Sequence, residues 1–357
     1  MSERAPAPFG VYVHVPFCAA RCDYCAFATW TDRAHLVDAY LEAMEVDVRR
    51  AVEAGMPAAS SVFVGGGTPT LVPASRLATL IQSIPLGAGA EVTVECNPDD
   101  VTPAIVETYA ASGVNRASIG VQSMVPHVLQ ALGRTHDPGN VERAVAAVRA
   151  AGLPTFNLDL IYGAMGESDA DWRTTVLRAL DLDPPHVSAY ALTVEPGTAL
   201  ADDPARHPDD DVQADDYELA DELLAAAGLA NYEVSNWARP GHECRHNLLY
   251  WGRRDYLGFG CAAHSHRAGR RWWNVRTPER YVEAVRSGRS AEAAGEELTP
   301  DAQRIEGLQL SLRTRAGVPI DSLDGNALPG LVERADDRWV LTRRGRLMAN
   351  EVAIRLR

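Results

Sequence analysis

Three cysteines crowded into eight positions are the residues of this sequence best suited to chemistry. Cys18, Cys22 and Cys25 follow the spacing C-x3-C-x2-C within the segment FCAARCDYCAF. One loop of this kind can wrap three thiolates around a single inorganic centre, as in iron–sulfur proteins. A structural zinc site normally needs a fourth ligand with its own pair spacing, and the sequence offers none nearby. Three thiolates leave one iron open, so the pattern favours a cluster that binds a further molecule over three incidental small residues.

Polar and glycine residues stand where the β-rich runs of the sequence end. Binding sites in α/β folds form at the carboxyl ends of parallel strands. We therefore expect these residues and the cysteines to line one binding site at that edge of the sheet. They are Gly67 and Thr68 after the second run, Glu95 in the third, Gln122 in the fourth and Asp159 in the fifth.

The chain alternates β-rich runs with segments of helical periodicity, which predicts six β/α units in series and a parallel sheet. The runs are rich in valine, isoleucine and small residues, as expected for buried strands. Doubly wound sheets and partial barrels both fit this alternation. The expected strands are 11–17, 61–66, 91–97, 116–122, 155–163 and 186–192, and the expected helices are 34–55, 74–84, 103–113, 140–152 and 169–182.

Composition excludes several classes of protein. The chain has 357 residues, 46% of them hydrophobic and 23% charged, which fits about two packed domains. Its net charge of −14 and the lack of a basic run argue against nucleic-acid binding. All 34 basic residues are arginine. Because there is no lysine, pyridoxal phosphate chemistry through a Schiff base and a standard phosphate-loop NTPase are excluded.

Charge is divided unevenly along the chain. Residues 1–235 hold 13 arginines against 33 acidic residues, and residues 236–357 hold 21 against 15, which gives net charges of −20 and +6. This split predicts a domain boundary near 235. The acidic stretch 201–216 is expected to be a solvated connection that continues as a helix over 218–227. The smaller C-terminal domain, 236–357, is expected to be α+β and winged-helix-like, with helices over 278–287 and 301–312, a strand over 338–342 and a last helix from about Arg344.

The beginning of the sequence and its hydropathy predict the compartment. The first residues, MSERAP, lead into an apolar run by Val11, so neither a charged leader nor a signal-peptide core is expected. No later stretch reaches the roughly 18 continuous apolar residues of a membrane span. We therefore expect a cytoplasmic protein, with peripheral attachment to a membrane as an alternative.

The cysteine spacing after the first strand, followed by GGGTP, resembles the radical S-adenosylmethionine (SAM) superfamily. A fuller set of motifs is similar to the branch that holds oxygen-independent coproporphyrinogen III oxidases and the HemW haem chaperones. The set comprises YVHVPFC, GGGTPT, ECNPDD, NRASIGVQS, LGRTHD, NLDLIYG and HNLLYW. The resemblance covers nearly the whole chain, and it implies an α/β fold with a partial (β/α)6 radical-SAM barrel.

The resemblance also implies roles for individual residues. Cys18, Cys22 and Cys25 would ligate a [4Fe-4S] cluster whose open iron takes the amino and carboxylate groups of SAM. A glycine turn lets backbone groups approach the methionine part of SAM, and a carboxylate accepts hydrogen bonds from its ribose. The residues implied to bind SAM are Tyr12, Tyr24, Gly67, Thr68, Glu95, Gln122, Arg134 and Asp159.

The motif H-N-x-x-Y-W implies haem binding within this branch. His246 offers an imidazole to haem iron, and Tyr250 and Trp251 offer flat apolar surface to the porphyrin. Nearby arginines are able to pair with the haem propionates. A buried, hydrogen-bonded histidine in a structural corner is the alternative reading of His246. The rival ligands are His242, Cys244, His264 and His266.

Departures from the oxidase pattern favour the chaperone. Phe27 stands where the oxidases commonly carry a further cysteine, and only about ten residues precede the first strand, where the oxidases have a longer extension. The expected function is therefore a radical-SAM-fold chaperone that transfers haem to acceptor haemoproteins, including respiratory and membrane-associated ones. An electron donor would supply its cluster. The alternative is an oxygen-independent coproporphyrinogen III oxidase, which converts two propionates to vinyls.

Overall fold

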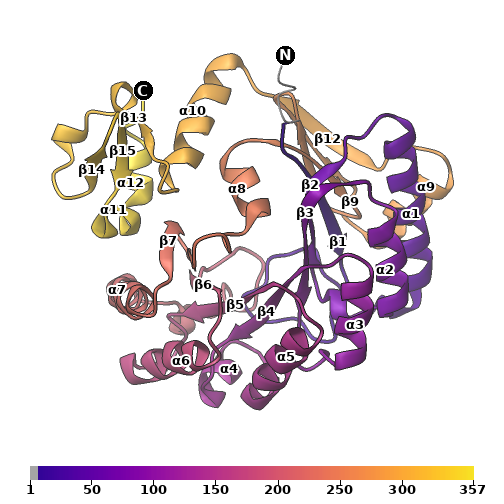
Figure 1. The fold of residues 1–357 in the computed structure, drawn as a ribbon, viewed down its shortest axis with the longest axis horizontal. Coiled ribbons are helices and arrows are strands. Elements are labelled where there is room, and N and C mark those ends of the chain that lie inside the picture. The colour runs from indigo at the N-terminus through magenta and orange to yellow at the C-terminus, as the bar shows by residue number, and fades with distance from the viewer. Residues whose placement is uncertain (1–6) are drawn as a thin grey trace.

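The computed structural model describes residues 7–357 and builds most of its strands into one 12-stranded sheet (Figure 1). Six parallel strands form the centre of this sheet in chain order. They are β1 (Phe9–Val15), β2 (Ala59–Gly66), β3 (Leu86–Cys96), β4 (Arg116–Gln122), β5 (Thr155–Tyr162) and β6 (His186–Ala191). The predicted parallel α/β fold is confirmed. The third strand begins five residues earlier than expected, because its first half consists of small residues, LGAGA, that do not resemble a β-rich run.

Helices follow the central strands and cover the convex face of the curved sheet (Figure 1). They are α1 (Val37–Glu53), α2 (Ala74–Gln82), α3 (Pro103–Ala111), α4 (Pro126–Ala131), α5 (Pro138–Ala150) and α6 (Asp169–Asp181). In α1 the buried residues include Leu41, Met44 and Val48, which are three and four positions apart and form one apolar stripe. The stripe belongs to the same core cluster as the strand residues Val11 and Val13.

Later segments extend the large sheet at both edges. Beside β1, the parallel strand β9 (Asp255–Phe259) is followed by the antiparallel strands β10 (His264–Arg267), β11 (Arg270–Asn274) and β12 (Glu292–Glu297). Beside β6 lie β8 (Asn236–Ala238) and β7 (Ala230–Glu233), both in antiparallel pairings. The sheet thus continues well past the boundary that charge suggested at 235. The division into domains at that residue stays a prediction.

The acidic stretch differs from its expectation. Helix α7 (Asp210–Ala226) begins inside it, before the predicted helix start at 218. Most side chains of residues 201–215 are exposed, as expected for a solvated stretch. The side chain of Asp209 caps this helix by accepting hydrogen bonds from the backbone N–H groups of Asp211 and Val212. Carboxylates are also favourable in the first turn, where backbone N–H groups are unpaired. The predicted helix start was wrong because a capping carboxylate and the acidic first turn favour a helix that begins within the acidic stretch.

The chain ends in a separate three-stranded antiparallel sheet of order β13-β15-β14. Its core contains Leu312, Val318 and Val352, and it matches the helix-and-ribbon pattern predicted for this region. The elements of this unit are α10 (Pro300–Leu312), β13 (Val318–Pro319), β14 (Val332–Ala335), β15 (Arg338–Leu341), α11 (Arg343–Leu347) and α12 (Ala349–Ala353). Helix α9 (Pro278–Arg286) instead packs on α1 and belongs to the core of the large sheet. Across residues 7–357, no helix is both long and apolar enough to cross a membrane. The expectation about a leader rests partly on residues 1–6, which lie outside the described residues.

Candidate functional site

The three clustered cysteines line one cavity of about 500 Å³ with most of the other predicted site residues. The cavity lies at the carboxyl ends of the central parallel strands, as the sequence predicted. The shared lining comprises Cys18, Cys22, Tyr24, Cys25, Gly67, Thr68, Glu95, Gln122, Arg134 and Asp159. Tyr12, which the resemblance placed in the same set, instead lines two neighbouring cavities.

The cysteine loop is tied to the glycine turn that follows β2. The backbone N–H of Gly67 donates to the carbonyl of Val15 at 2.7 Å, and that of Thr68 donates to the carbonyl of Phe17 at 2.8 Å. The hydroxyl of Thr68 lies 3.7 Å from the sulfur of Cys18. A Cβ at position 67 would come within 2.6 Å of the Phe17 carbonyl and 3.0 Å of that sulfur. Glycine is therefore required at position 67 so that the cysteine loop can pack against this turn, and not only to leave space for a ligand.

Substituting Gly67 with alanine is expected to lower cluster loading, because the added methyl group pushes the cysteine loop away from β2. Anaerobic reconstitution followed by iron and sulfide assays measures this. Gly87→Ala is the matched control, since the nearest atom to its Cβ is 3.4 Å away, an ordinary contact. Full loading in the Gly67 variant would contradict the account of this turn.

Three thiol groups on one cavity wall are a donor set that suits an iron–sulfur cluster. Within residues 7–357, no group of three or more histidine, cysteine or acidic side chains converges on the position of one metal ion. Each cysteine of a four-iron cluster binds a different iron, so the sulfurs need not converge. Arg134 supplies positive charge beside them, with Nη1 3.6 Å from the sulfur of Cys22.

Two acidic side chains face this cavity from β3 and β5. Glu95 accepts a hydrogen bond from the backbone N–H of Gly66 at 3.0 Å, and Asp159 accepts one from the Ser118 hydroxyl at 2.7 Å. Burial, reinforced by the charge of Asp159, raises the pKa of Glu95 to about 7. Burial also raises the pKa of Asp159. Both carboxyl groups stand where they can accept hydrogen bonds from a bound ligand.

Gln122 ends β4 in a strained conformation. Its φ is +63°, in the left-handed region that side chains other than glycine seldom adopt, and the pairing of β4 with β5 is irregular between Gly120 and Gln122. Backbone strain of this kind often accompanies binding sites, since the surrounding structure must maintain it. The irregularity places Gln122 on the wall of the cysteine cavity.

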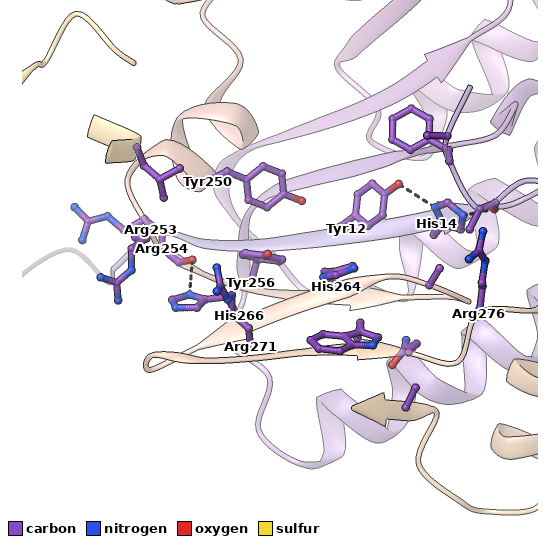
Figure 2. A pocket seen from close by; sticks show the side chains of 18 of the residues that line it. Tyr12, His14, Tyr250, Arg253, Arg254, Tyr256, His264, His266, Arg271 and Arg276 are labelled. Atoms are coloured by element: carbon purple, nitrogen blue, oxygen red, sulfur yellow. Dashed lines mark hydrogen bonds between the residues drawn. The ribbon is translucent and has the colours of Figure 1, made fainter. Parts of the chain in front are cut away.

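A second, larger cavity of about 840 Å³ adjoins the first (Figure 2). It lies over β10 and β11, and its walls include Tyr12 from β1 and Tyr250 from the end of α8 (Arg245–Trp251). Phe27 lines both this cavity and the cysteine cavity, and its side chain is 66% exposed. Phe27, which replaces a cysteine of the oxidase pattern, therefore lies between the two cavities.

The predicted haem ligand His246 is buried in α8, against β2 and β3. It is 1% exposed, its Nδ1 lies 2.9 Å from the Ser61 hydroxyl, and its Nε2 lies 2.8 Å from the Tyr250 hydroxyl. Burial lowers the pKa of this imidazole to about 3, so the ring is neutral. One donor and one acceptor nitrogen are therefore both satisfied. His246 can bind iron only if one of these hydrogen bonds breaks, and its role as the axial ligand stays a prediction.

Tyr250 lies between the spaces that the other two motif residues line. Tyr250 lines a cavity of about 320 Å³ together with His246, and it also lines the large cavity. Trp251 lines a third space of about 320 Å³, which Tyr250 also lines and where the guanidinium of Arg313 lies 5.8 Å from the Trp251 ring centre. His246 and Trp251 therefore line two neighbouring spaces that share Tyr250.

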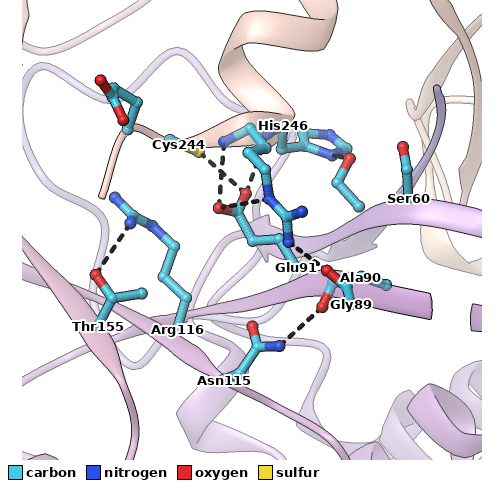
Figure 3. Close-up of polar contacts among 12 residues, drawn as sticks. Ser60, Gly89, Ala90, Glu91, Asn115, Arg116, Thr155, Cys244 and His246 are labelled. Carbon is cyan, nitrogen blue, oxygen red and sulfur yellow. Dashed lines mark hydrogen bonds and ion pairs between the residues drawn. The ribbon is translucent and has the colours of Figure 1, made fainter. Parts of the chain in front are cut away.

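Glu91 on β3 is a key residue that the sequence analysis missed (Figure 3). It is 5% exposed and accepts hydrogen bonds from the backbone N–H groups of Arg245 and His246 at 3.2 and 3.1 Å. The thiol of Cys244 lies 3.7 Å from the same carboxylate. Glu91 thus anchors the start of α8 to the sheet. A charged residue within the strand segment LGAGAEVTVEC is the sequence signal that could have revealed it.

Comparison with known proteins agrees with this arrangement. The family model of the Radical SAM superfamily matches residues 12–179, which carry the cysteine loop and five central strands. A solved structure of coproporphyrinogen III oxidase (HemN) from Escherichia coli superposes with a TM-score of 0.84 over 97% of this chain and 89% of that one, at 24% identity. This likeness shows a shared fold. The fold and the cysteine loop together are similar to those of radical SAM proteins.

Curated relatives identify the branch. The chain is 44% identical to the protein named Heme chaperone HemW of Mycobacterium tuberculosis, over 97% of this chain and 94% of that protein. It is 35% identical to the protein of the same name from Escherichia coli, over 97% of both chains. This chain therefore belongs to the HemW family.

Proposed function

We propose that this protein is a haem chaperone, which binds haem and passes it to haem-accepting apoproteins. The observation that carries the proposal is the match, along nearly the whole chain, to relatives named Heme chaperone HemW. The large cavity beside the cysteine cavity supports it, because it gives the protein room for a second, bulky ligand. We place the protein in the cytoplasm, with acceptors that include respiratory proteins at the membrane.

The proposal assigns a [4Fe-4S] cluster to Cys18, Cys22 and Cys25 and SAM to the rest of that cavity. Such a cluster with SAM supplies one-electron chemistry when an electron donor reduces it. Thr68, Arg134 and the strand-end carboxylates would orient the bound molecule, and Phe27 would limit access from the large cavity. The common location of these residues supports the assignment.

The rival function, oxidation of coproporphyrinogen III, is distinguished by its product. We expect the reconstituted, reduced protein with SAM to yield no divinyl tetrapyrrole from coproporphyrinogen III, and to develop a Soret band when haem is added. Chromatography of the tetrapyrroles and an absorbance titration measure the two outcomes, with HemN from Escherichia coli as the positive control. Formation of the divinyl product would make the oxidase the better description.

SAM binding is expected to strengthen as the pH rises through about 7. Glu95 must be ionised to accept two hydrogen bonds from a ribose, and its pKa in the SAM-free protein is about 7. Below that pH the folded protein holds the proton, and SAM binding must displace it. Between about pH 6 and about pH 8 we expect affinity to rise about tenfold through this group.

Isothermal titration at a series of pH values measures that effect. The amino group of SAM also titrates, so the contribution of Glu95 is the difference between the wild type and Glu95→Gln, which keeps a hydrogen-bonding oxygen without the charge. Parallel pH profiles for the two proteins would contradict the assigned role.

A further inference from the structure

The large cavity has walls suited to a flat, anionic, metal-containing ligand. Aromatic rings from β1, α8, β9 and β11 surround it. Its lining also holds four arginines and one acidic residue, Glu306, although the whole chain carries a net charge of −14. An apolar lining with a few placed charges is typical of small-molecule sites, and guanidinium groups suit carboxylates.

His264 offers an imidazole to this space. It pairs with Trp273 across the β10–β11 hairpin, and the two rings stack with their centres 5.6 Å apart. The side chain is exposed, and among the residues described its ring nitrogens make no hydrogen bond. The partial burial of the ring against the cavity wall and the charge of Arg271 lower the pKa of His264, so the ring is neutral and keeps a lone pair for a metal. Trp273 fixes the plane of that ring.

His266 is a weaker candidate on the same wall. It lies two residues further along β10, so both histidines face the same side of the sheet. However, His266 is only 5% exposed, and its Nδ1 lies 3.2 Å from the backbone carbonyl of Arg254. Its Nε2 has no partner among residues 7–357, but it is buried. Burial keeps a porphyrin from reaching it without a change in the wall.

Arginines gather at one end of the cavity, beside His266 (Figure 2). Arg253 and Arg271 both pair with Glu306 on α10. The ion pairs formed by residues 7–357 do not include Arg254, whose side chain is exposed and lines the cavity. This end therefore has a guanidinium free for a ligand carboxylate, with two more close by.

We infer that haem binds in this cavity, with His264 as the axial ligand of its iron and its propionates directed to the arginine cluster around Arg254. The inference rests on the proposed haem-chaperone function, and it states where the protein binds the haem that it transfers. The observation that separates it from ligation by His246 is that both ring nitrogens of His246 already have partners inside the protein. Haem in this cavity would lie beside Phe27, next to the cluster loop.

Titration of the full-length protein with ferric haem tests the inference. We expect His264→Ala to shift the Soret band and to weaken haem binding at least about tenfold, because the iron loses its strong axial donor. His246→Gln, which can keep one hydrogen bond to Tyr250 or Ser61, should retain the wild-type spectrum. His127→Ala removes an exposed histidine that does not line the cavity and serves as the matched control. Circular dichroism confirms that each variant is folded.

Metal-free protoporphyrin IX separates coordination from packing. It has the same ring and propionates but no iron, so His264→Ala should bind it as the wild type does, whereas Arg254→Gln should weaken the binding of both porphyrins. If His264→Ala keeps the wild-type haem spectrum and affinity, or if His246→Gln alone shifts the Soret band, the inferred site is wrong and the chaperone function stands. If the wild type binds no haem, the proposed function itself fails.

Discussion

Replacing Cys18, Cys22 and Cys25 together by serine is expected to abolish the iron–sulfur cluster. The wild type should hold about four irons and four sulfides per chain after anaerobic reconstitution, as a cubane cluster requires. The triple variant should hold almost none and lose the brown absorption, because the loop that lines the cavity then offers no thiolate. Iron and sulfide assays with absorbance spectroscopy measure the loss.

The other three cysteines provide the matched control. Cys96, Cys244 and Cys261 are all buried, and burial raises the pKa of each to about 12, which keeps them as thiols. Replacing these three by alanine should leave the cluster in place, although Cys96 touches the same cavity. Cluster loss in this second variant and retention in the first would overturn the ligand assignment.

Glu91→Ala is expected to lower the free energy of unfolding by about 3 kcal/mol. The substitution leaves two backbone N–H groups at the start of α8 without an acceptor in a buried place, and it removes a negative charge from a helix N-terminus. Urea denaturation measures the change. Because α8 also carries Tyr250, which lines the large cavity, the spectrum of bound haem should also broaden or shift.

Two further variants test whether the loss of stability is specific to Glu91. Glu91→Gln keeps one acceptor oxygen and should lose about half as much stability. Glu283→Ala removes a carboxylate that is 71% exposed and pairs with Arg289 on the surface, so it should change stability by no more than about 0.5 kcal/mol. Equal stability of Glu91→Ala and Glu283→Ala would show that Glu91 does not anchor α8.

The sequence predicts the parallel part of the fold because each apolar run there is bounded by turns, and because the alternation of these runs with helical segments indicates a parallel sheet. β4 begins and ends at the predicted residues, since its apolar run is bounded by turns at both ends. The same strands determine the site, because parallel strands deliver their carboxyl ends to one edge. This is why residues as distant as Cys18 and Asp159 could be placed in one cavity from their positions alone.

The antiparallel edge and the contacts of α8 could not be predicted in the same way. Glu91 meets His246 across 155 positions of the chain, and no local pattern encodes such a pairing. The environment of His264 depends on its register with Trp273 and on the packing of β9 beside β1. The motif around His246 predicts haem binding in this region, but a motif cannot show that both ring nitrogens are already hydrogen-bonded.

Transfer of haem to an acceptor tests the central claim most directly. The full-length protein is loaded with haem, mixed with a haem-free b-type cytochrome and an excess of serum albumin, and followed by the absorbance of the cytochrome. Albumin captures haem that is merely released. The account predicts that the cytochrome gains haem in the presence of albumin, faster than from free haem. Haem that remains on the protein, or that passes only to albumin, would contradict the chaperone function.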